Sequence, residues 1–134
     1  MTKKTEKLKA LSDETRLRIL NLFIKSGDSL CVCELVDALK LPQYHISKHL
    51  IVLRNAGYFQ QVREGTWVYY KIDNSLPENK IIISFLKKIL DDEIFEKDYE
   101  QLNKRLILRE DNKCVVGFVD ESELLKLIKQ KEKV

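Results

Sequence analysis

Two cysteines separated by one residue, Cys31 and Cys33, are the side chains in this sequence best suited to chemistry. Two soft thiolates close together suit a thiophilic ion. On a regular helix, residues two apart point about 200° away from each other, at roughly 100° per residue. The two sulfurs therefore share one ion only where the backbone is not helical. The pair stands at the expected start of a helix, where such a departure is tolerated and where the helix N-terminus lowers a thiol pKa.

The alternative is that these cysteines are small apolar core residues, because free cysteine is often buried. The third thiol, Cys114, heads an apolar run far along the chain, and the same two interpretations apply to it. We expect no signal peptide, because the charged first residues are not followed by an apolar stretch, and no apolar run approaches the roughly 18 residues that span a bilayer. We therefore expect a cytoplasmic protein with no membrane partner, whose thiols are reduced rather than paired in disulfides.

Apolar spacing and capping residues predict the helices that must position the thiols. Ser12 is the expected N-cap of one helix, Pro42 the first residue of another, and Gly57 the C-terminal cap of that second helix. The expected helices cover 5–11, 13–25, 33–39, 42–55, a long apolar stretch after Pro77, a polar stretch over 93–109, and a last segment from Asp120.

Aromatic and β-branched residues predict two strands, 58–63 and 67–72, joined by a turn at 64–66. A third extended stretch is expected over 114–119. The order helix, helix, tight turn, helix, hairpin is that of a winged helix-turn-helix. The predicted fold class is therefore mainly α with a small β-hairpin wing.

The helix over 42–55 has the features of a DNA-reading helix. Ile46, Leu50 and Leu53 recur at one face and anchor it to the core. The opposite face carries amide, hydroxyl and cationic side chains suited to base edges and phosphates. The predicted contacts are Gln43, Tyr44, Ser47 and Lys48 on this helix, Arg63 at the wing, and Lys40 as a further phosphate contact. The alternative is an ordinary solvated helix face.

Charge distribution agrees with a DNA partner. The net charge of the 134 residues is only +3. Residues 1–72, however, hold 12 Lys or Arg against 7 Asp or Glu, whereas residues 73–134 hold 12 against 14. The positive excess thus lies in the half with the expected reading helix, as phosphate binding requires. A thiol enzyme is not expected, because no cysteine is paired with a base in a phosphate-cradling loop.

Several separated motifs resemble the ArsR/SmtB family of repressors over roughly residues 5–95. They are LSDETRLRIL at 11–20, PQYHISKHL at 42–50, LRNAG at 53–57 and WVYYKI at 67–72. The resemblance implies a homodimer that represses an operator on double-stranded DNA and releases it on binding a metal or metalloid. His49 matches a family position on the reading helix and joins the DNA-binding residues. Tyr44 departs from the small serine common in the family.

The segment LCVCEL at 30–35 resembles the family's arsenic-sensing motif. The resemblance implies no permanent cofactor and an effector, arsenite As(III) or antimonite Sb(III), held by Cys31, Cys33 and a third thiolate. The third cysteine of the family's best-known arrangement is missing, which leaves Cys114 from the same subunit or from the partner. The rival effectors are cadmium, lead or thiol oxidation. A site at His45 and His49, and a zinc or nickel site on the long helix, are less favoured.

We expect residues 1–95 to form the DNA-binding and dimerisation domain and residues 96–134 a C-terminal extension. The helix over 81–90 is apolar nearly all round, so a second copy is expected to cover it. In the expected mechanism, arsenite draws Cys31 and Cys33 together, bends the start of their helix and reorients the reading helix that follows.

Overall fold

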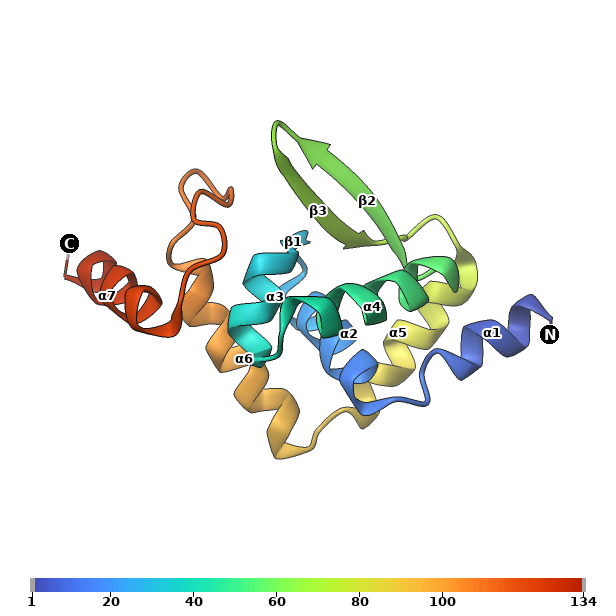
Figure 1. Cartoon of the computed structure of the whole chain (residues 1–134). Coiled ribbons are helices and arrows are strands. Elements are labelled where there is room, and N and C mark those ends of the chain that lie inside the picture. Colours follow the sequence, from blue (N-terminus) through green and yellow to red (C-terminus); the bar gives the residue numbers. More distant parts are fainter. Residues whose placement is uncertain (1, 134) are drawn as a thin grey trace.

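The computed structural model describes residues 2–133 and is mostly helical, with one small sheet (Figure 1). Helices α2, α3 and α4 are followed by a two-stranded wing, β2 and β3, which is the order predicted for a winged helix-turn-helix. The elements are α1 Lys3–Lys9, α2 Glu14–Ser26, β1 Leu30–Cys31, α3 Val32–Leu39, α4 Gln43–Asn55, β2 Phe59–Glu64, β3 Trp67–Ile72, α5 Pro77–Ile89, α6 Glu93–Leu106 and α7 Glu121–Glu132.

The starts of α2 and α4 each lie one residue after the prediction. The N-cap of α2 is Asp13, whose carboxylate accepts the Arg16 N–H at 3.0 Å. The prediction of Ser12 was wrong because the Ser12 hydroxyl donates to the Lys9 carbonyl at the end of α1. Pro42 is the N-cap of α4 rather than its first helical residue. The left-handed backbone predicted for Gly57 is confirmed, with φ at 86°.

The wing is an antiparallel hairpin that turns at Gly65, which has φ at 61°. A third strand, β1, pairs with the other edge of β3 and gives the order β1-β3-β2. Leu30 lies opposite Tyr70, and Cys31 lies opposite Tyr69. Strand β1 was not predicted, because two residues are too few to give an alternating pattern. It ties the first cysteine to the wing.

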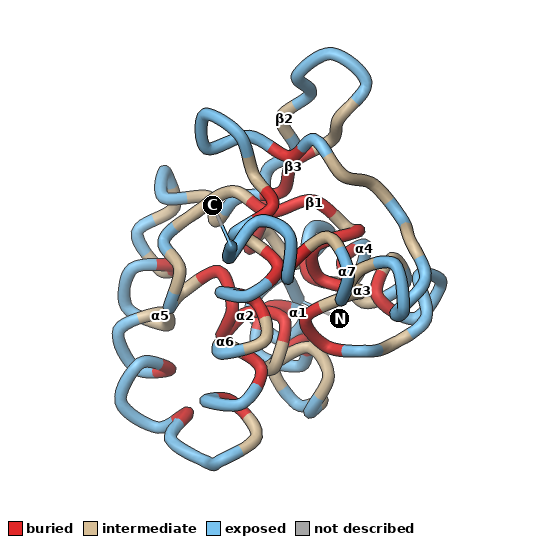
Figure 2. Tube along the Cα trace, turned by 90° about the vertical axis from the view of Figure 1, so that its left-hand side faces the viewer, coloured by how far each residue is buried: buried red, intermediate tan, exposed pale blue. Residues whose placement is uncertain are grey.

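The core lies where α2, α3, α4 and α6 meet, as the buried segments of Figure 2 show. Leu50 of α4 and Leu35 of α3 are fully buried there. Phe95 and Leu102 of α6 belong to the same cluster, and Asp98 accepts both Arg18 donors at 2.8 and 2.9 Å. The expected boundary between residues 95 and 96 therefore falls inside α6, which packs on α2 and α3.

The chain after α6 runs as a C-terminal loop, residues 107–120, before α7 begins. Its only regular pairing is a single bridge between Glu110 and Lys113. The stretch predicted as extended over 114–119 forms no strand. Over the described residues, no helix has the length and apolar character needed to cross a membrane.

Candidate metal centre and nucleic-acid interface

The structure brings all three cysteines together in a buried cluster. The sulfurs of Cys31, Cys33 and Cys114 lie within 4.8 Å of one another. Cys31 is the N-cap of α3, with extended backbone at φ −88° and ψ 157°, and Cys33 lies in the first helical turn. The two-residue spacing therefore meets the predicted condition that the backbone is not helical at the pair. We name these three thiols the thiol centre.

The proximity of the sulfurs corrects the expected mechanism. Bending of the start of α3 is not needed to bring Cys31 and Cys33 together, because Cys31 already lies outside the helix. The consequence of binding has to be sought in the segments that hold the thiols.

Cys114 is held in place by the wing and by its own loop. Its N–H donates to the Tyr69 hydroxyl at 2.9 Å, and its sulfur lies 3.7 Å from the Cys33 sulfur. The Val116 carbonyl oxygen lies 3.3 Å from the Cys114 sulfur. The cysteine that approaches the pair therefore comes from the same chain. The partly buried side chain of Trp67, on β3, packs against this cluster.

Arg109 fastens the C-terminal loop to the start of α3. Its guanidinium donates to both carboxylate oxygens of Glu34 at 2.7 Å each, and to the Ser29 carbonyl at 2.7 Å. Glu34 is fully buried, and it also accepts the Cys31 N–H at 3.0 Å. The Glu34 carboxylate therefore holds the C-terminal loop, through Arg109, and also orients Cys31.

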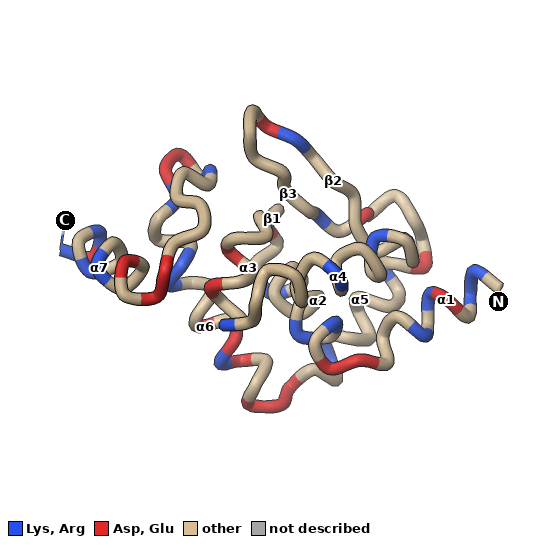
Figure 3. The backbone as a smooth tube through the Cα atoms, in the orientation of Figure 1, with Lys and Arg blue, Asp and Glu red and all other residues tan. Residues whose placement is uncertain are grey.

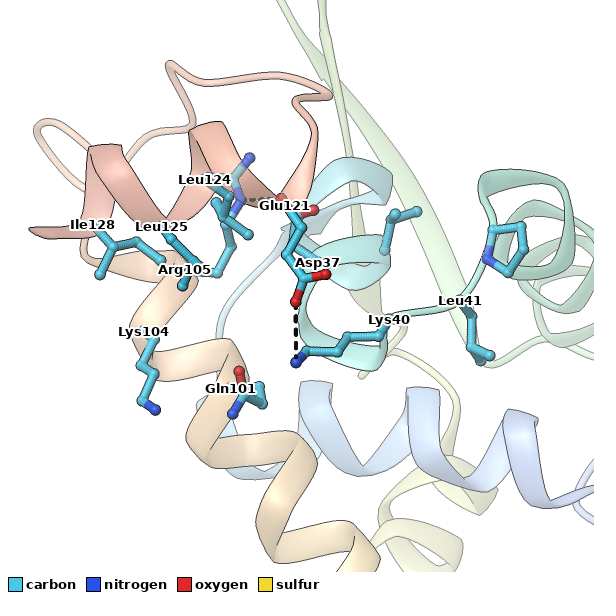
Figure 4. Close-up of a pocket in the computed structure, with 12 residues that line it drawn as sticks. Asp37, Lys40, Leu41, Gln101, Lys104, Arg105, Glu121, Leu124, Leu125 and Ile128 are labelled. Atoms are coloured by element: carbon cyan, nitrogen blue, oxygen red, sulfur yellow. Dashed lines mark hydrogen bonds and ion pairs between the residues drawn. The ribbon is translucent and has the colours of Figure 1, made fainter.

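A second arginine, Arg105 of α6, makes a parallel set of contacts. It donates to Asp37 of α3 at 2.6 Å and to the carbonyls of Val116 and Gly117 at 2.6 and 3.1 Å. Figure 4 shows Arg105 and Asp37 beside a cavity of about 630 Å³ between α3, α6 and α7. Sequence reasoning missed both arginines. The sequence feature that could have indicated them is the presence of two acidic residues, Glu34 and Asp37, on the otherwise apolar helix α3, because a buried carboxylate needs a cationic partner.

The electrostatics of the thiol centre concentrate negative charge on one sulfur. Hydrogen bonds with Cys31 and then Cys33, followed by the nearby Arg105 and Arg109, lower the pKa of Cys114. Hydrogen bonding to Cys114 raises the pKa of Cys31 and of Cys33. Burial beside an existing thiolate opposes a second charge at the pair, which counteracts the lowering of the thiol pKa expected from the helix N-terminus.

The predicted DNA contacts on α4 lie on one accessible face. Gln43, Tyr44 and Lys48 are exposed and Ser47 is half-buried, while Ile46 and Leu50 point into the core as predicted. Tyr44 is 69% exposed, although its ring stacks edge-on against His45 with centroids 4.6 Å apart. Figure 3 shows basic residues on α1, α4 and the wing, and acidic residues near the starts of α6 and α7.

The remaining predicted DNA contacts differ in their exposure and in the partners they already have within the protein. Arg63 is exposed on β2. His49 is half-buried and lies 3.3 Å from the Arg16 guanidinium, and burial lowers its pKa, so it supports the helix as an uncharged ring. The Lys40 ammonium lies 3.5 Å from Glu121 of α7, and both side chains are more than 60% exposed (Figure 4). An exposed ion pair of this kind contributes little stability, so Lys40 can exchange Glu121 for a DNA phosphate.

Comparisons with known proteins agree with this architecture. The family model described as "Bacterial regulatory protein, arsR family" matches residues 13–60. The chain is 43% identical over 83 residues to the arsenic resistance transcriptional regulator ArsR1 of Pseudomonas putida, and the match spans 62% of each protein, less than two thirds of that relative. It is 33% identical over 92 residues to the arsenical resistance operon repressor of Bacillus subtilis, covering 66% of this chain and 87% of that one.

Among solved structures, reduced HlyU from Vibrio cholerae superposes with a TM-score of 0.58 at 32% identity. The alignment covers 67% of this chain and 90% of HlyU. The matched family consists of regulatory proteins, which confirms the prediction that the chain is not an enzyme. From its motifs, its winged helix-turn-helix and its relatives, the chain belongs to the arsR family of bacterial regulatory proteins.

Proposed function

We propose that this protein is a repressor that binds operator DNA as a homodimer and releases it when trivalent arsenic binds the thiol centre. The observation that carries the proposal is the assembly of Cys31, Cys33 and Cys114 in one buried cluster beneath the wing and α3. Three soft thiolates are the donor set expected for a thiophilic metalloid.

The chemistry of binding is an exchange of oxygen for sulfur at arsenic. Arsenous acid loses three As–O bonds and gains three As–S bonds. The two thiol protons and one proton from solvent leave with the hydroxyl groups as three water molecules. The product carries no charge, so binding removes the negative charge that Cys114 holds beside Arg105 and Arg109. Antimonite offers the same exchange.

The function is tested by fluorescence anisotropy with a duplex enriched from a random-sequence pool by the metal-free protein. Arsenite, antimonite, cadmium, lead and hydrogen peroxide are titrated separately. We expect arsenite and antimonite to weaken DNA binding about a hundredfold, which corresponds to a coupling of about 3 kcal/mol. Release by cadmium, lead or peroxide alone would replace the metalloid with a divalent ion or an oxidant as the effector.

Replacing Gln43 by alanine is expected to lower affinity for the enriched duplex by roughly 5- to 150-fold, because an amide that reads a base edge contributes about 1–3 kcal/mol. Lys48→Ala should instead weaken all duplexes alike and reduce the salt slope of the binding constant by about 1. Lys97→Ala, on an exposed position of α6, is the control. Equal losses for Gln43→Ala on enriched and scrambled duplexes would contradict base reading.

The homodimer is supported by an exposed apolar stripe on α5. Ile81, Phe85 and Ile89 recur four residues apart and are 72%, 56% and 47% exposed, and Leu8 of α1 is 62% exposed. Phe85→Asp is expected to weaken dimerisation by about 3 kcal/mol or more, because the ring is buried twice across a two-fold interface. Sedimentation equilibrium measures this change, with Lys87→Ala as a control on another face of α5. A Phe85→Asp protein that stays dimeric would place the interface elsewhere.

A further inference from the structure

We propose that the wing strand β3, through Tyr69 and Trp67, carries the state of the thiol centre to the DNA. The inference rests on the proposed function and adds the element that transmits its signal. The sequence reasoning had placed this signal in α3 and the link to the reading helix.

The wing contacts two of the three thiol residues directly. Tyr69 lies opposite Cys31 in the β1–β3 pairing, and its hydroxyl accepts the Cys114 N–H at 2.9 Å. Tyr69 itself is only 5% exposed, so this hydrogen bond lies in a buried setting. One residue of β3 therefore connects to both cysteines that lie outside α3, to Cys31 through the strand pairing and to Cys114 through its hydroxyl.

The C-terminal loop contacts the wing at two further places. The Trp67 ring lies 3.6 Å from the position that a Cβ on Gly117 would occupy, so the glycine leaves room for the indole against the loop. At the tip of the wing, the Lys113 ammonium lies 3.4 Å from Glu64. The loop that supplies Cys114 thus lies along β3 and reaches the end of β2.

Binding of one arsenic atom fixes the separations of all three sulfurs. Cys33 is part of α3, which packs in the core, whereas Cys31 lies in the strand paired with β3 and Cys114 lies in a loop hydrogen-bonded to Tyr69. A shift in the positions of Cys31 and Cys114 on arsenic binding is therefore expected to displace Tyr69 and the strand that carries it. Because Arg63 of β2 is the predicted wing contact with DNA, a displaced hairpin weakens the complex without any distortion of α4.

The decisive variant is Tyr69→Phe, which keeps the ring and removes only the hydroxyl that accepts from Cys114. We expect arsenite to bind with unchanged stoichiometry, because all three thiols remain. The arsenite-induced loss of DNA affinity should fall at least about fivefold, which is the contribution of one neutral hydrogen bond. Tyr70→Phe is the matched control, because the Tyr70 hydroxyl accepts from Gln61 within the wing at 2.8 Å.

Hydrogen–deuterium exchange of the DNA-free wild type gives an independent measurement. Arsenite is expected to change the exchange of amides in residues 59–72 and to leave residues 43–55 unchanged. A change confined to residues 39–55 overturns the inference, as does a full arsenite response in Tyr69→Phe or loss of arsenite binding by that variant. If the wild type itself neither binds arsenite nor releases DNA, the proposed function fails and the inference falls with it.

Discussion

Replacing both Cys31 and Cys33 by serine is expected to abolish release of DNA by arsenite. The two residues supply two of the three sulfurs in the thiol centre, and a single remaining thiol cannot close the coordination of trivalent arsenic. The roughly hundredfold loss of DNA affinity caused by arsenite in the wild type should shrink to less than about twofold, because an effector acts only through its differential affinity for two states.

The thiol variants are measured by the same anisotropy titration, and their DNA affinity without arsenite is the control for folding. Cys114→Ser keeps the adjacent pair and is expected to retain a weaker response at higher arsenite concentrations. An intact arsenite response in the double variant would exclude Cys31 and Cys33 as the effector ligands. An unchanged response in Cys114→Ser would make Cys114 a core residue, which was the alternative for it.

Replacing Arg109 by methionine is expected to lower the free energy of unfolding by about 3–5 kcal/mol. Arg109 and Glu34 are buried partners, with side chains 6% and 0% exposed, and removal of one leaves the other charge without compensation. Urea denaturation measures the change. Because the same carboxylate accepts the Cys31 N–H, the variant should also bind arsenite more weakly.

The control is the double variant Glu34→Gln with Arg109→Met, which removes both charges. We expect it to be more stable than Arg109→Met alone, since replacing a buried ion pair costs much less than breaking it. A single variant within about 1 kcal/mol of the wild type would mean that Glu34 finds water or another donor. The pair would then not hold the C-terminal loop.

The sequence was sufficient for the local parts of the structure. The apolar spacing of Ile46, Leu50 and Leu53 predicted the buried face of α4, and Gly57 marked its end. The aromatic runs predicted the wing. These features depend on neighbours along the chain, so their patterns are visible in the sequence.

The parts that sequence reasoning left open or missed all depend on contacts between distant segments. Cys114 lies 81 residues from Cys33, and no periodicity connects them. Arg109 meets Glu34 across 75 positions, and its role follows only from how α6 packs on α3. The structure also shows that the thiol pair lies at the edge of the sheet, because β1 is too short to predict. The composition of the thiol centre was therefore predictable, but its surroundings were not.

The origin of Cys114 in a late segment of the chain has a consequence for the lifetime of the protein. An arsenic atom bound by Cys33 and Cys114 acts as a removable cross-link that closes a loop of about 80 residues. Part of the binding free energy then appears as folding stability. If the proposed function holds, the arsenic-bound protein is expected to resist unfolding and proteolysis better than the same protein without arsenic or DNA.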